Sequence, residues 1–348
     1  MARIVRFLSL AIALMFPLAA AEHVSPSHFP GAHWEQRDAA SFGLDGAVLD
    51  RLAEALGGRG CVIKDGYVVK AWGAQSEIGD WFSSAKPVLS TLLLFAIAEG
   101  KAPSVDTPIK EFGWELNAKD QGITFRHLAD MTSGFRRPEA PGAAYAYNDF
   151  AIQLYQKTLF DKVFRGDPER VANDPKRFGF LGLEDGLKFR AKDRRLSASV
   201  RDFARIAWFW MNSGNWNGTE LLPERLFRDY RKPDVPRTLP ISRGADSEDY
   251  LGIGSYGGGS NQVQTAGPGN YGFNWWFNRP GPKGDSPLWP DAPPDLFASL
   301  GARGNCSFLI PHLNLALISA FGAWGPNPEE SANPHLRLLM QAVRKARP

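Results

Sequence analysis

The sequence predicts an α+β fold in which one central antiparallel sheet is built from both ends of the chain and flanked by helices. Strand patterns occur near residues 61–69 and again between residues 271 and 321, whereas residues 150–235 carry mostly helical patterns. The dipeptide Asp65-Gly66 between two β-rich runs also predicts a hairpin, which is an antiparallel unit. The helical middle of the chain is therefore expected to be a subdomain inserted between the two halves of the sheet.

The N-terminal part of the fold is expected to be a helix followed by that hairpin. Asp45 is a good N-cap, and Gly57-Gly58 is a typical stop, so a helix is expected through Leu56. The two strands of the hairpin are predicted at Cys61–Ile63 and Tyr67–Val69.

A second helix is predicted from Ser83 to about Glu99. Pro87 falls in its first turn, where the missing N–H costs little, and Gly100 ends it. Residues 92–98 are apolar nearly all round, so this helix should be buried between layers.

The remainder of the chain alternates capped helices, one long loop and short strands. Ser199 should cap a helix that continues through Phe203–Met211. Residues 236–270 are rich in Gly, Ser and Pro and predict a long loop, of a length that is usually functional or mobile. The last elements are expected to be strands at 271–278, 296–298, 307–310 and 315–321 and a helix at 334–345.

Composition excludes several classes of protein. The chain has 348 residues, of which 44% are hydrophobic and 22% charged, as in an ordinary globular protein. Its net charge is +3, which falls to +1 without Arg3 and Arg6 of the first 21 residues. Such a balance does not predict a nucleic-acid partner.

Residues 1–21 have the pattern of a signal peptide. Two arginines precede the apolar run Phe7–Leu18, and small residues end at Ala21. The run is short for a membrane span, so no stable membrane insertion is expected. The protein is predicted to be exported, and to be periplasmic or secreted after cleavage near Ala21.

Neither the cysteines nor the histidines predict a cofactor. Cys61 and Cys306 could form a disulfide in an exported protein, but two separate buried thiols are favoured. The six histidines show no HExxH pattern, and no cysteine pair has metal-ligand spacing. No metal and no other cofactor is therefore predicted.

Ser83 and Lys86 are the first candidate catalytic pair. Positions i and i+3 of a helix share one face, so the hydroxyl and the amine can meet. A serine hydroxyl needs a nearby base to act as a nucleophile, and a lysine can serve if its pKa is lowered in a closed pocket. The spacing alone is a weak signal, because an ordinary amphipathic helix start would also explain it.

Several further motifs accompany this pair, in a fixed order along the chain. They are Glu99-Gly100-Lys101, Asp106-Thr107-Pro108, the stretch Ile123–Phe135 and the later helix Arg201–Asn212. With these motifs nearly the whole chain after residue 21 resembles the serine β-lactamase-related hydrolases. The similar branch contains class C β-lactamases, DD-peptidases, esterases and 6-aminohexanoate-dimer hydrolases, and the resemblance implies a β-lactamase/transpeptidase-like fold.

The resemblance implies a role for each matching residue. Ser83 would be the acylating nucleophile and Lys86 the neighbouring base. Tyr147 of Tyr147-Asn148-Asp149 would be the tyrosine that shares protons with Ser83 and the leaving group. A tyrosine pKa lowered by Lys86 would suit this role. Tyr145 is a competing candidate that lacks a polar residue two positions on. The backbone N–H groups of Ser83 and Ala302 would form the oxyanion hole.

The sequence departs from the family pattern at two places. Asp149 stands where the family often has Asn, and a carboxylate there would favour a charged Lys86 unless it is paired or points away. The third motif, Lys or His-x-Gly, has its best match in Ser299-Leu300-Gly301, which lacks the cation that would hold a substrate carboxylate. Arg303 is a candidate replacement for that charge, with an ordinary loop arginine as the alternative.

Three other conspicuous side chains are expected to be structural. His127 lies in the Ile123–Phe135 stretch but has no catalytic role in the family. Trp81 and Trp275-Trp276 could line a cleft, but their strand-like context favours the core.

We therefore expect residues 22–348 to be a single catalytic domain, with a sheet subdomain at about 40–82 and 250–348 and a helical subdomain at about 83–249. The predicted function is a serine hydrolase that acts on a small-molecule ester or amide through a Ser83 acyl-enzyme. The missing third-motif cation favours amidases and esterases over true β-lactamases or DD-peptidases. A non-catalytic ligand-binding protein is the alternative, and the sequence does not predict the oligomeric state.

Overall fold

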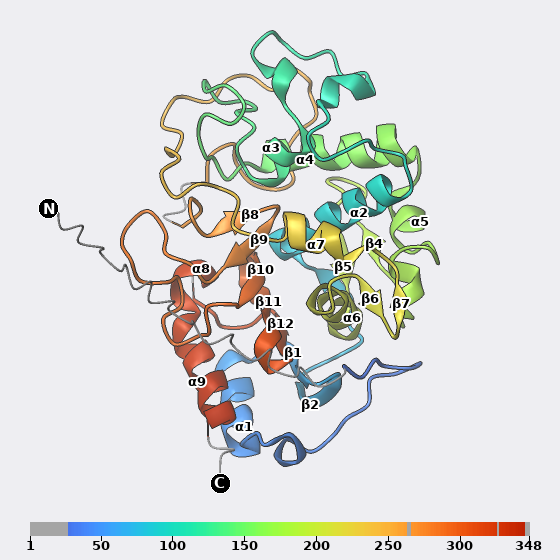
Figure 1. Cartoon of the computed structure of the whole chain (residues 1–348), viewed down its shortest axis with the longest axis vertical. Helices are drawn as coiled ribbons and strands as arrows, with labels where there is room; N and C mark the ends of the chain where they lie inside the picture. The colour runs from blue at the N-terminus through green and yellow to red at the C-terminus, as the bar shows by residue number, and fades with distance from the viewer. Residues whose placement is uncertain (1–26, 263–265, 326, 345–348) are drawn as a thin grey trace, which may run out of the picture.

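The computed structural model describes residues 27–262, 266–325 and 327–344. Its centre is a seven-stranded antiparallel sheet in the order β2-β1-β12-β11-β10-β9-β8 (Figure 1). The strands come from the two ends of the described chain, so the predicted α+β architecture is confirmed. They are β1 Arg59–Lys64, β2 Tyr67–Trp72, β8 Tyr271–Gly272, β9 Trp275–Phe277, β10 Phe297–Gly301, β11 Asn305–Ile310 and β12 Leu315–Ala320. The predicted signal peptide lies outside the described residues.

Helices cover both faces of this sheet. On one side, α1 (Gly46–Leu56) packs against α9 (Asn333–Arg344), and on the other α6 (Val200–Met211) contacts β1, β11 and β12 (Figure 1). The Asp45 side chain accepts the Val48 N–H, and the Ser199 side chain accepts the Asp202 N–H, as the cap residues predicted.

Two hairpins of the sheet, β1–β2 and β8–β9, turn through left-handed residues. Asp65 and Gly66 have φ of 52° and 90°, which confirms the predicted hairpin between β1 and β2. The single strand expected at 271–278 is wrong, because Phe273 and Asn274 have φ of 48° and 72° and fold this segment back on itself. Asn tolerates this conformation, but a Phe-Asn pair between aromatic residues gives no turn signal in the sequence.

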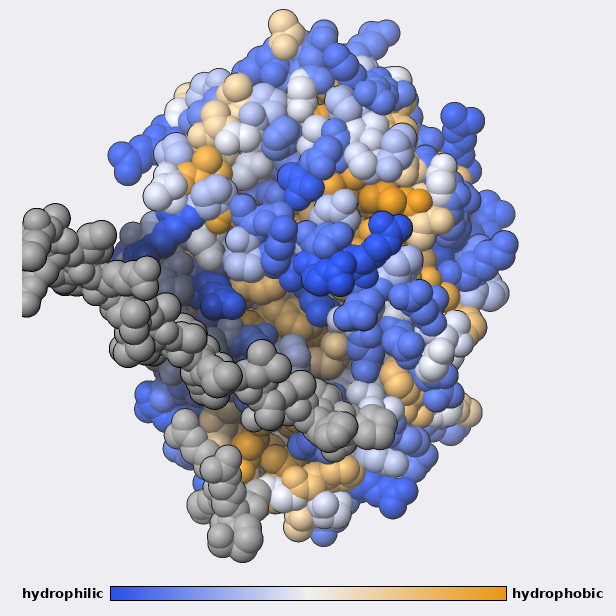
Figure 2. Space-filling view, in the orientation of Figure 1, coloured by the Kyte–Doolittle hydropathy of each residue, from blue (hydrophilic) through white to orange (hydrophobic). Residues whose placement is uncertain are grey.

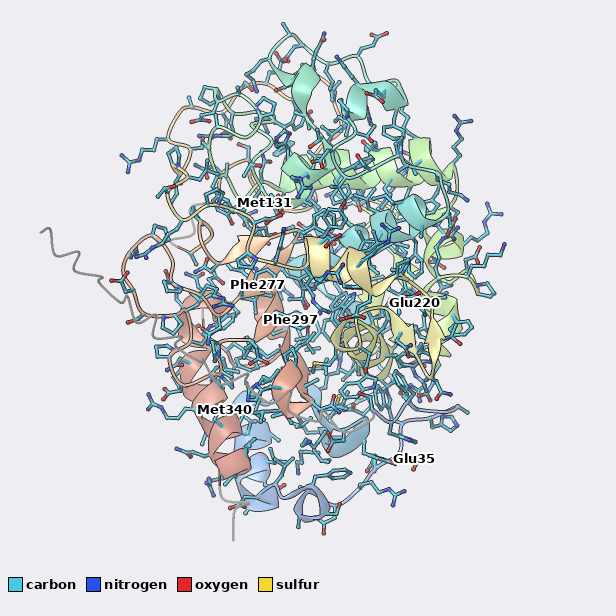
Figure 3. All side chains as sticks on the ribbon, in the orientation of Figure 1. Glu35, Met131, Glu220, Phe277, Phe297 and Met340 are labelled. Atoms are coloured by element: carbon cyan, nitrogen blue, oxygen red, sulfur yellow. The ribbon has the colours of Figure 1, made fainter. Side chains whose placement is uncertain are left out.

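Apolar residues pair across the neighbouring strands β9 and β10. Phe277 of β9 pairs with Phe297 of β10, and Figure 3 shows the two side by side near the middle of the molecule. At the molecular surface hydrophilic side chains dominate, with smaller hydrophobic areas between them (Figure 2). The apolar side chains are thus mostly used to hold the sheet and its helices together.

The nucleophile candidate lies at a helix start between the sheet and the middle of the chain. A 3-10 turn at Phe82–Ala85 leads into α2 (Lys86–Ala98), whose residues from Lys86 to Ala96 are all buried. The buried helix predicted for this segment is confirmed.

The middle of the chain contains helices and two small sheets. The short strand β3 (Gly79–Asp80) just before the nucleophile turn pairs with β5. The remaining elements are α3 Phe125–Ala129, α4 Asp149–Lys157, a π-helix at Thr158–Phe164, α5 Pro168–Ala172, β4 Lys188–Phe189, β5 Leu196–Ala198, β6 Asn215–Trp216, β7 Thr219–Glu220, α7 Glu224–Tyr230 and α8 Pro328–Ser331. Short 3-10 turns occur at Ala39–Phe42, Ile109–Phe112, Asp120–Gly122, Phe178–Leu181, Ala302–Gly304 and Pro311–Leu313.

Cys61 and Cys306 are free thiols, both buried on neighbouring parts of the sheet. Burial raises the pKa of the Cys61 thiol to about 12, so it is a small core side chain and is inert at neutral pH. Among the described helices, none combines the length and the apolar character that a membrane crossing requires.

A buried carboxyl ties the tight turn of the β8–β9 hairpin to the segment before the site. Asp130 is 5% exposed, and its Oδ1 accepts the backbone N–H of Phe273 at 2.6 Å. Burial raises the pKa of Asp130 to about 7; the hydrogen bond from Phe273 and the charge of Arg126 oppose the rise, and Asp234 adds to it. The folded protein therefore holds this carboxyl in its neutral form under conditions where the unfolded chain ionises it.

We predict that Asp130→Asn makes the protein less sensitive to rising pH. Because the folded pKa lies above the unfolded one, the stability from Asp130 is fully present below the unfolded pKa and is lost as pH rises to about 7. The loss can reach about 4 kcal/mol, and the Asn variant keeps the acceptor for Phe273 but does not titrate. Urea unfolding at about pH 5 and about pH 8 measures this. Equal pH dependence in the two proteins would contradict it.

Candidate active site

The turn that carries Ser83 is held in an unfavourable backbone conformation. Phe82, the residue before Ser83, has φ of 49°, which is uncommon for an aromatic residue. Its N–H donates to Asp80 Oδ1 at 2.8 Å, and Arg195 holds the other oxygen of that carboxylate at 2.5 Å. The surrounding structure thus fixes Ser83 at the edge of the turn, as is common at functional sites.

Lys86 is the centre of the polar cluster. Its Nζ donates to Ser83 Oγ at 2.7 Å and to Tyr147 Oη at 2.8 Å. Asp149 Oδ1 lies 2.7 Å from the same nitrogen, in an ion pair rather than an aligned hydrogen bond. The structure therefore brings together the three residues proposed from the sequence and adds Asp149 as a direct partner of the lysine.

Helix α4 explains why Tyr147 and Asp149 both reach Lys86. Asn148 between them is the N-cap of this helix, and its Oδ1 accepts the N–H groups of Phe150 and Ala151 at 3.0 and 3.1 Å. Asn148 Nδ2 donates to the carbonyl of Phe135 at 2.6 Å. The cap thus anchors the helix start to the preceding signature segment.

The long loop predicted at 236–270 covers this cluster. The Tyr256 N–H donates to the carbonyl of Asp149 at 3.0 Å, and the Gln262 N–H donates to the carbonyl of Tyr147 at 2.9 Å. A Cβ on Gly258 would lie 2.6 Å from Asp149 Oδ2, so the loop backbone passes directly over the carboxylate at this residue. The loop therefore contributes to keeping the ion pair dry.

Charge balance in the cluster determines the resting protonation state. Burial alone would lower the pKa of Lys86, but the charge of Asp149 and the interaction with the Tyr147 oxygen outweigh it, and the pKa is raised. Burial raises the pKa of Tyr147, against the opposing effect of Lys86. At neutral pH the site therefore holds a lysine ammonium and a neutral phenol. The lowered tyrosine pKa expected from the resemblance is wrong, because desolvation exceeds the attraction of the lysine.

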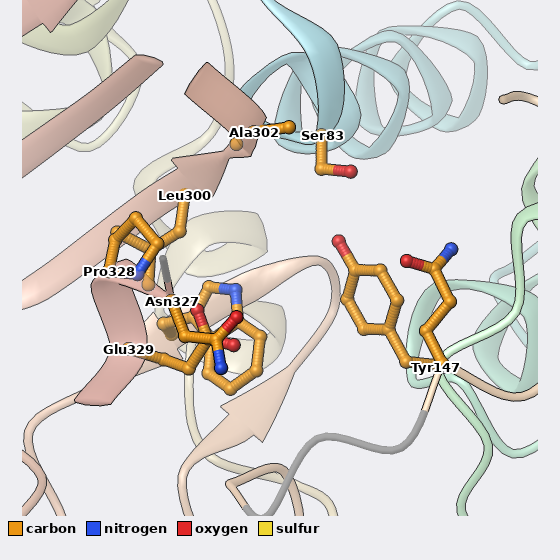
Figure 4. A pocket seen from close by; sticks show the side chains of 10 residues that line it. Ser83, Tyr147, Leu300, Ala302, Asn327, Pro328 and Glu329 are labelled. Carbon is orange, nitrogen blue, oxygen red and sulfur yellow. The ribbon is translucent and has the colours of Figure 1, made fainter. Parts of the chain in front are cut away.

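A cavity of about 160 Å³ opens beside Ser83 and Tyr147. In Figure 4 the hydroxyls of Ser83 and Tyr147 point toward one another from opposite sides of this space, and Asn327, Pro328 and Glu329 form a separate wall. The rest of the lining consists of Gln262, Trp276, Leu300, Gly301 and Ala302. The nucleophile candidate is thus accessible to a small molecule, while Lys86 behind it is fully buried.

The third-motif strand supports the nucleophile turn. The hydroxyl of Ser299 is hydrogen-bonded to those of Ser84 at 3.0 Å and Ser307 at 2.7 Å, and Ser299 is completely buried. A Cβ on Gly301 would lie 2.6 Å from the backbone nitrogen of Ser84, so β10 passes directly against the turn. Ser299, the best sequence match to the third motif, is therefore a short side chain that holds Ser84.

Arg303 does not line the catalytic cavity. Its guanidinium lies 5.6 Å from the ring centre of Phe82, and its side chain is exposed. The alternative interpretation, an ordinary loop arginine, agrees better with this position than a carboxylate anchor does.

Three other conspicuous residues have structural positions outside the polar cluster. Tyr145 is buried and makes no contact with Lys86, and its hydroxyl has no hydrogen-bond partner in the described residues. His127 caps α3 through Thr124, which fits its expected structural role. Trp81 is stacked on Phe203 at 3.7 Å and is also core.

Sequence reasoning missed three residues around the site. Trp276, which was expected in the core, lines the cavity and stacks on Tyr147 at a centroid distance of 6.2 Å. Tyr256 places its ring 5.5 Å from Lys86 Nζ. Glu329 contributes a carboxylate to the cavity wall. The Gly-rich composition near Tyr256 was a usable signal, whereas nothing near Glu329 distinguished it from a surface acid.

The described residues contain no group of three or more His, Cys, Asp or Glu side chains placed to hold a metal ion.

Comparisons with known proteins agree with this architecture. A family model described as "Beta-lactamase" matches residues 44–185. A Bacillus anthracis protein provisionally named 6-aminohexanoate-dimer hydrolase is 15% identical, with 92% of this chain and 89% of that chain covered and a TM-score of 0.61. No curated protein matches the sequence.

Two further solved structures share the fold. A "Beta-lactamase/D-alanine Carboxypeptidase" from Yersinia pestis is 15% identical, with 88% of this chain and 98% of that chain covered and a TM-score of 0.59. EstCE1, described as a hydrolase with promiscuous acyltransferase activity, is 11% identical over 88% and 98%, with a TM-score of 0.56. The family match covers residues 44–185, and the solved structures share the fold of the described chain.

We predict that Asp149→Asn makes the site more reactive toward the same substrate at neutral pH. Because the carboxylate raises the pKa of Lys86, its removal lets burial lower that pKa and increases the fraction of free amine. The rising limb of the rate against pH should move to lower pH, by about one unit or more.

The profile is measured as kcat/KM for a nitrophenyl ester across the stable pH range, with wild type and Lys86→Ala as references. A limb that stays in place or moves to higher pH in Asp149→Asn would contradict the assigned charge of Lys86.

Proposed function

We propose that this protein hydrolyses a small ester or amide through an acyl-enzyme on Ser83. The observation that carries the proposal is the position of one buried amine, Lys86 Nζ, within 2.7 and 2.8 Å of the Ser83 and Tyr147 hydroxyls. A serine at a cavity wall with a base in direct contact is the arrangement that nucleophilic catalysis needs.

The proton steps follow from the resting state. Lys86 first loses a proton to solvent, and the free amine then accepts the proton of Ser83 as its oxygen attacks the substrate carbonyl carbon. Tyr147, a neutral phenol, donates its proton to the departing alcohol or amine and regains one from the Lys86 ammonium. Water then attacks the acyl carbon and gives one proton to Lys86. Lys86 passes this proton to Ser83 Oγ as the bond between Ser83 and the acyl group breaks, which releases the acid and restores the serine hydroxyl.

Backbone N–H groups support the developing charge in this proposal. Ser83 and Ala302 both line the cavity and lie in short 3-10 turns, whose first N–H groups lack partners within the turn. Two such donors at one wall would form the oxyanion hole for the tetrahedral intermediate.

The cavity also favours a substrate class. Among the described residues that line it there is no lysine, arginine or histidine, and Ser299 replaces the family's cation with a buried hydroxyl. A carboxylate on the substrate would meet no positive partner there. We therefore favour esters and amides without an obligatory carboxylate over penicillins and D-Ala-D-Ala termini. We also propose that the protein is exported and acts in the periplasm or outside the cell.

We predict that Ser83→Ala reduces ester turnover by at least about a thousandfold, since the nucleophile is lost while the cavity remains. Treatment with a serine-reactive phosphonate should add one covalent group to the wild type, located at Ser83 by peptide mass spectrometry.

Ser84→Ala is the matched control, because this neighbouring hydroxyl faces Ser299 instead of the cavity. It should still be labelled at Ser83. Wild-type protein that stays unlabelled, or turnover that survives Ser83→Ala, would point to a non-catalytic binding protein instead.

A further inference from the structure

Glu329 is a buried carboxylate without a cationic partner. It is 4% exposed, and no ion pair or side-chain hydrogen bond from another described residue reaches its carboxylate. Burial raises the pKa of this carboxyl, its own backbone N–H opposes the rise, and the charge of Glu330 adds to it. An unpaired buried charge is costly. A carboxylate kept next to the cavity can therefore be stabilised by a cationic ligand, because the protein itself supplies no such partner.

The position of Glu329 connects it to the reaction. It lines the cavity of Ser83 and Tyr147, and it also lines a second cavity of about 380 Å³ beside it. Figure 4 shows Glu329 on the wall opposite Tyr147, next to Pro328 and Asn327. A ligand bound to Ser83 can therefore have another part against this carboxylate.

Charge around the cavity is negative once the buried pairs are counted. Lys86 and Asp149 neutralise one another at 2.7 Å, and Lys86 is shielded from the cavity behind Ser83. Glu329 is then the only ionisable carboxylate or basic side chain among the described lining residues. Complementarity thus calls for a positive group on the ligand.

An aromatic ring in the same cavity favours an ammonium-type cation as the positive group of the ligand. Trp276 lines the same cavity and is 2% exposed, with its ring stacked on Tyr147. Tryptophan rings attract alkylated ammonium groups through their π face, and a nearby carboxylate adds a direct ion pair.

We propose that Glu329 is a specificity-determining residue that binds an ammonium group of the substrate, so that the preferred ester or amide is cationic. This inference rests on the proposed function of Ser83 and names the substrate class of the same site. The cavity would then prefer a cationic substrate. A cavity with a lysine or histidine that holds a carboxylate would have the opposite preference.

The test uses nitrophenyl esters of straight-chain acids that differ only at the far end, which carries a trimethylammonium group, its neutral tert-butyl isostere or a carboxylate. At the best chain length wild type should favour the ammonium ester over the neutral one by about tenfold in kcat/KM, and should disfavour the carboxylate. In Glu329→Gln this ratio should fall to near one.

Glu330→Gln removes the same charge from the next residue, whose side chain is exposed. Its ratio should fall far less, because solvent screens that carboxylate. Equal losses in the two variants would overturn the assignment of Glu329. The isosteric Gln keeps the shape of the side chain, and thermal unfolding of each variant verifies that it is folded.

The result separates this inference from the proposed function. Wild type that hydrolyses the neutral ester but shows no ammonium preference overturns the role of Glu329 and leaves Ser83 catalysis standing. Wild type that hydrolyses none of the three esters overturns both.

Discussion

The site depends on one buried ion pair, between the Lys86 ammonium and the Asp149 carboxylate. Burying a charge is costly unless it is paired and surrounded by hydrogen-bonding groups, and breaking such a pair leaves the remaining charge exposed to that cost. Ser83 and Tyr147 supply the other oxygens around the ammonium. The four side chains are therefore best understood as a unit whose members fix one another.

Much of the surrounding architecture maintains this unit. The Asn148 cap holds Tyr147 and Asp149 at the start of α4, and the loop near Gly258 closes over the carboxylate. Lys86 itself is the first residue of the buried apolar helix α2. From the other end of the chain, Gly301 on β10 lets the sheet press against the nucleophile turn. The pairing also has a chemical cost, since a lysine held in its charged form is a weaker base than a free amine.

Under the proposed function, the cavity wall would suit a ligand charge different from the one expected of related hydrolases. The strand that would carry a cation in related hydrolases carries Ser299, whose hydroxyl is used to hold the turn. The short helix α8 meanwhile brings Glu329 to the opposite wall. The two changes act in the same direction, because one removes a positive charge from the cavity and the other adds a negative one.

Local sequence signals predicted the elements that local chemistry determines. Asp65-Gly66, the Asp45 and Ser199 caps and the apolar run of α2 all lie where their propensities indicated. The hairpin at Phe273-Asn274 was not predictable, because its left-handed residues are imposed by packing and by the Asp130 acceptor. The neutral state of Tyr147 and the presence of Glu329 in the cavity wall were also missed. Both depend on contacts between segments far apart in the chain.

The charge of Lys86 at neutral pH is the central claim, and it can be observed directly. The ¹⁵N chemical shift of lysine side chains, assigned with Lys86→Arg, reports whether this nitrogen is an ammonium or an amine. The structure predicts that Lys86 remains an ammonium through the neutral range and becomes easier to deprotonate in Asp149→Asn. A free amine in the wild-type protein at neutral pH, unaffected by loss of Asp149, would contradict the account.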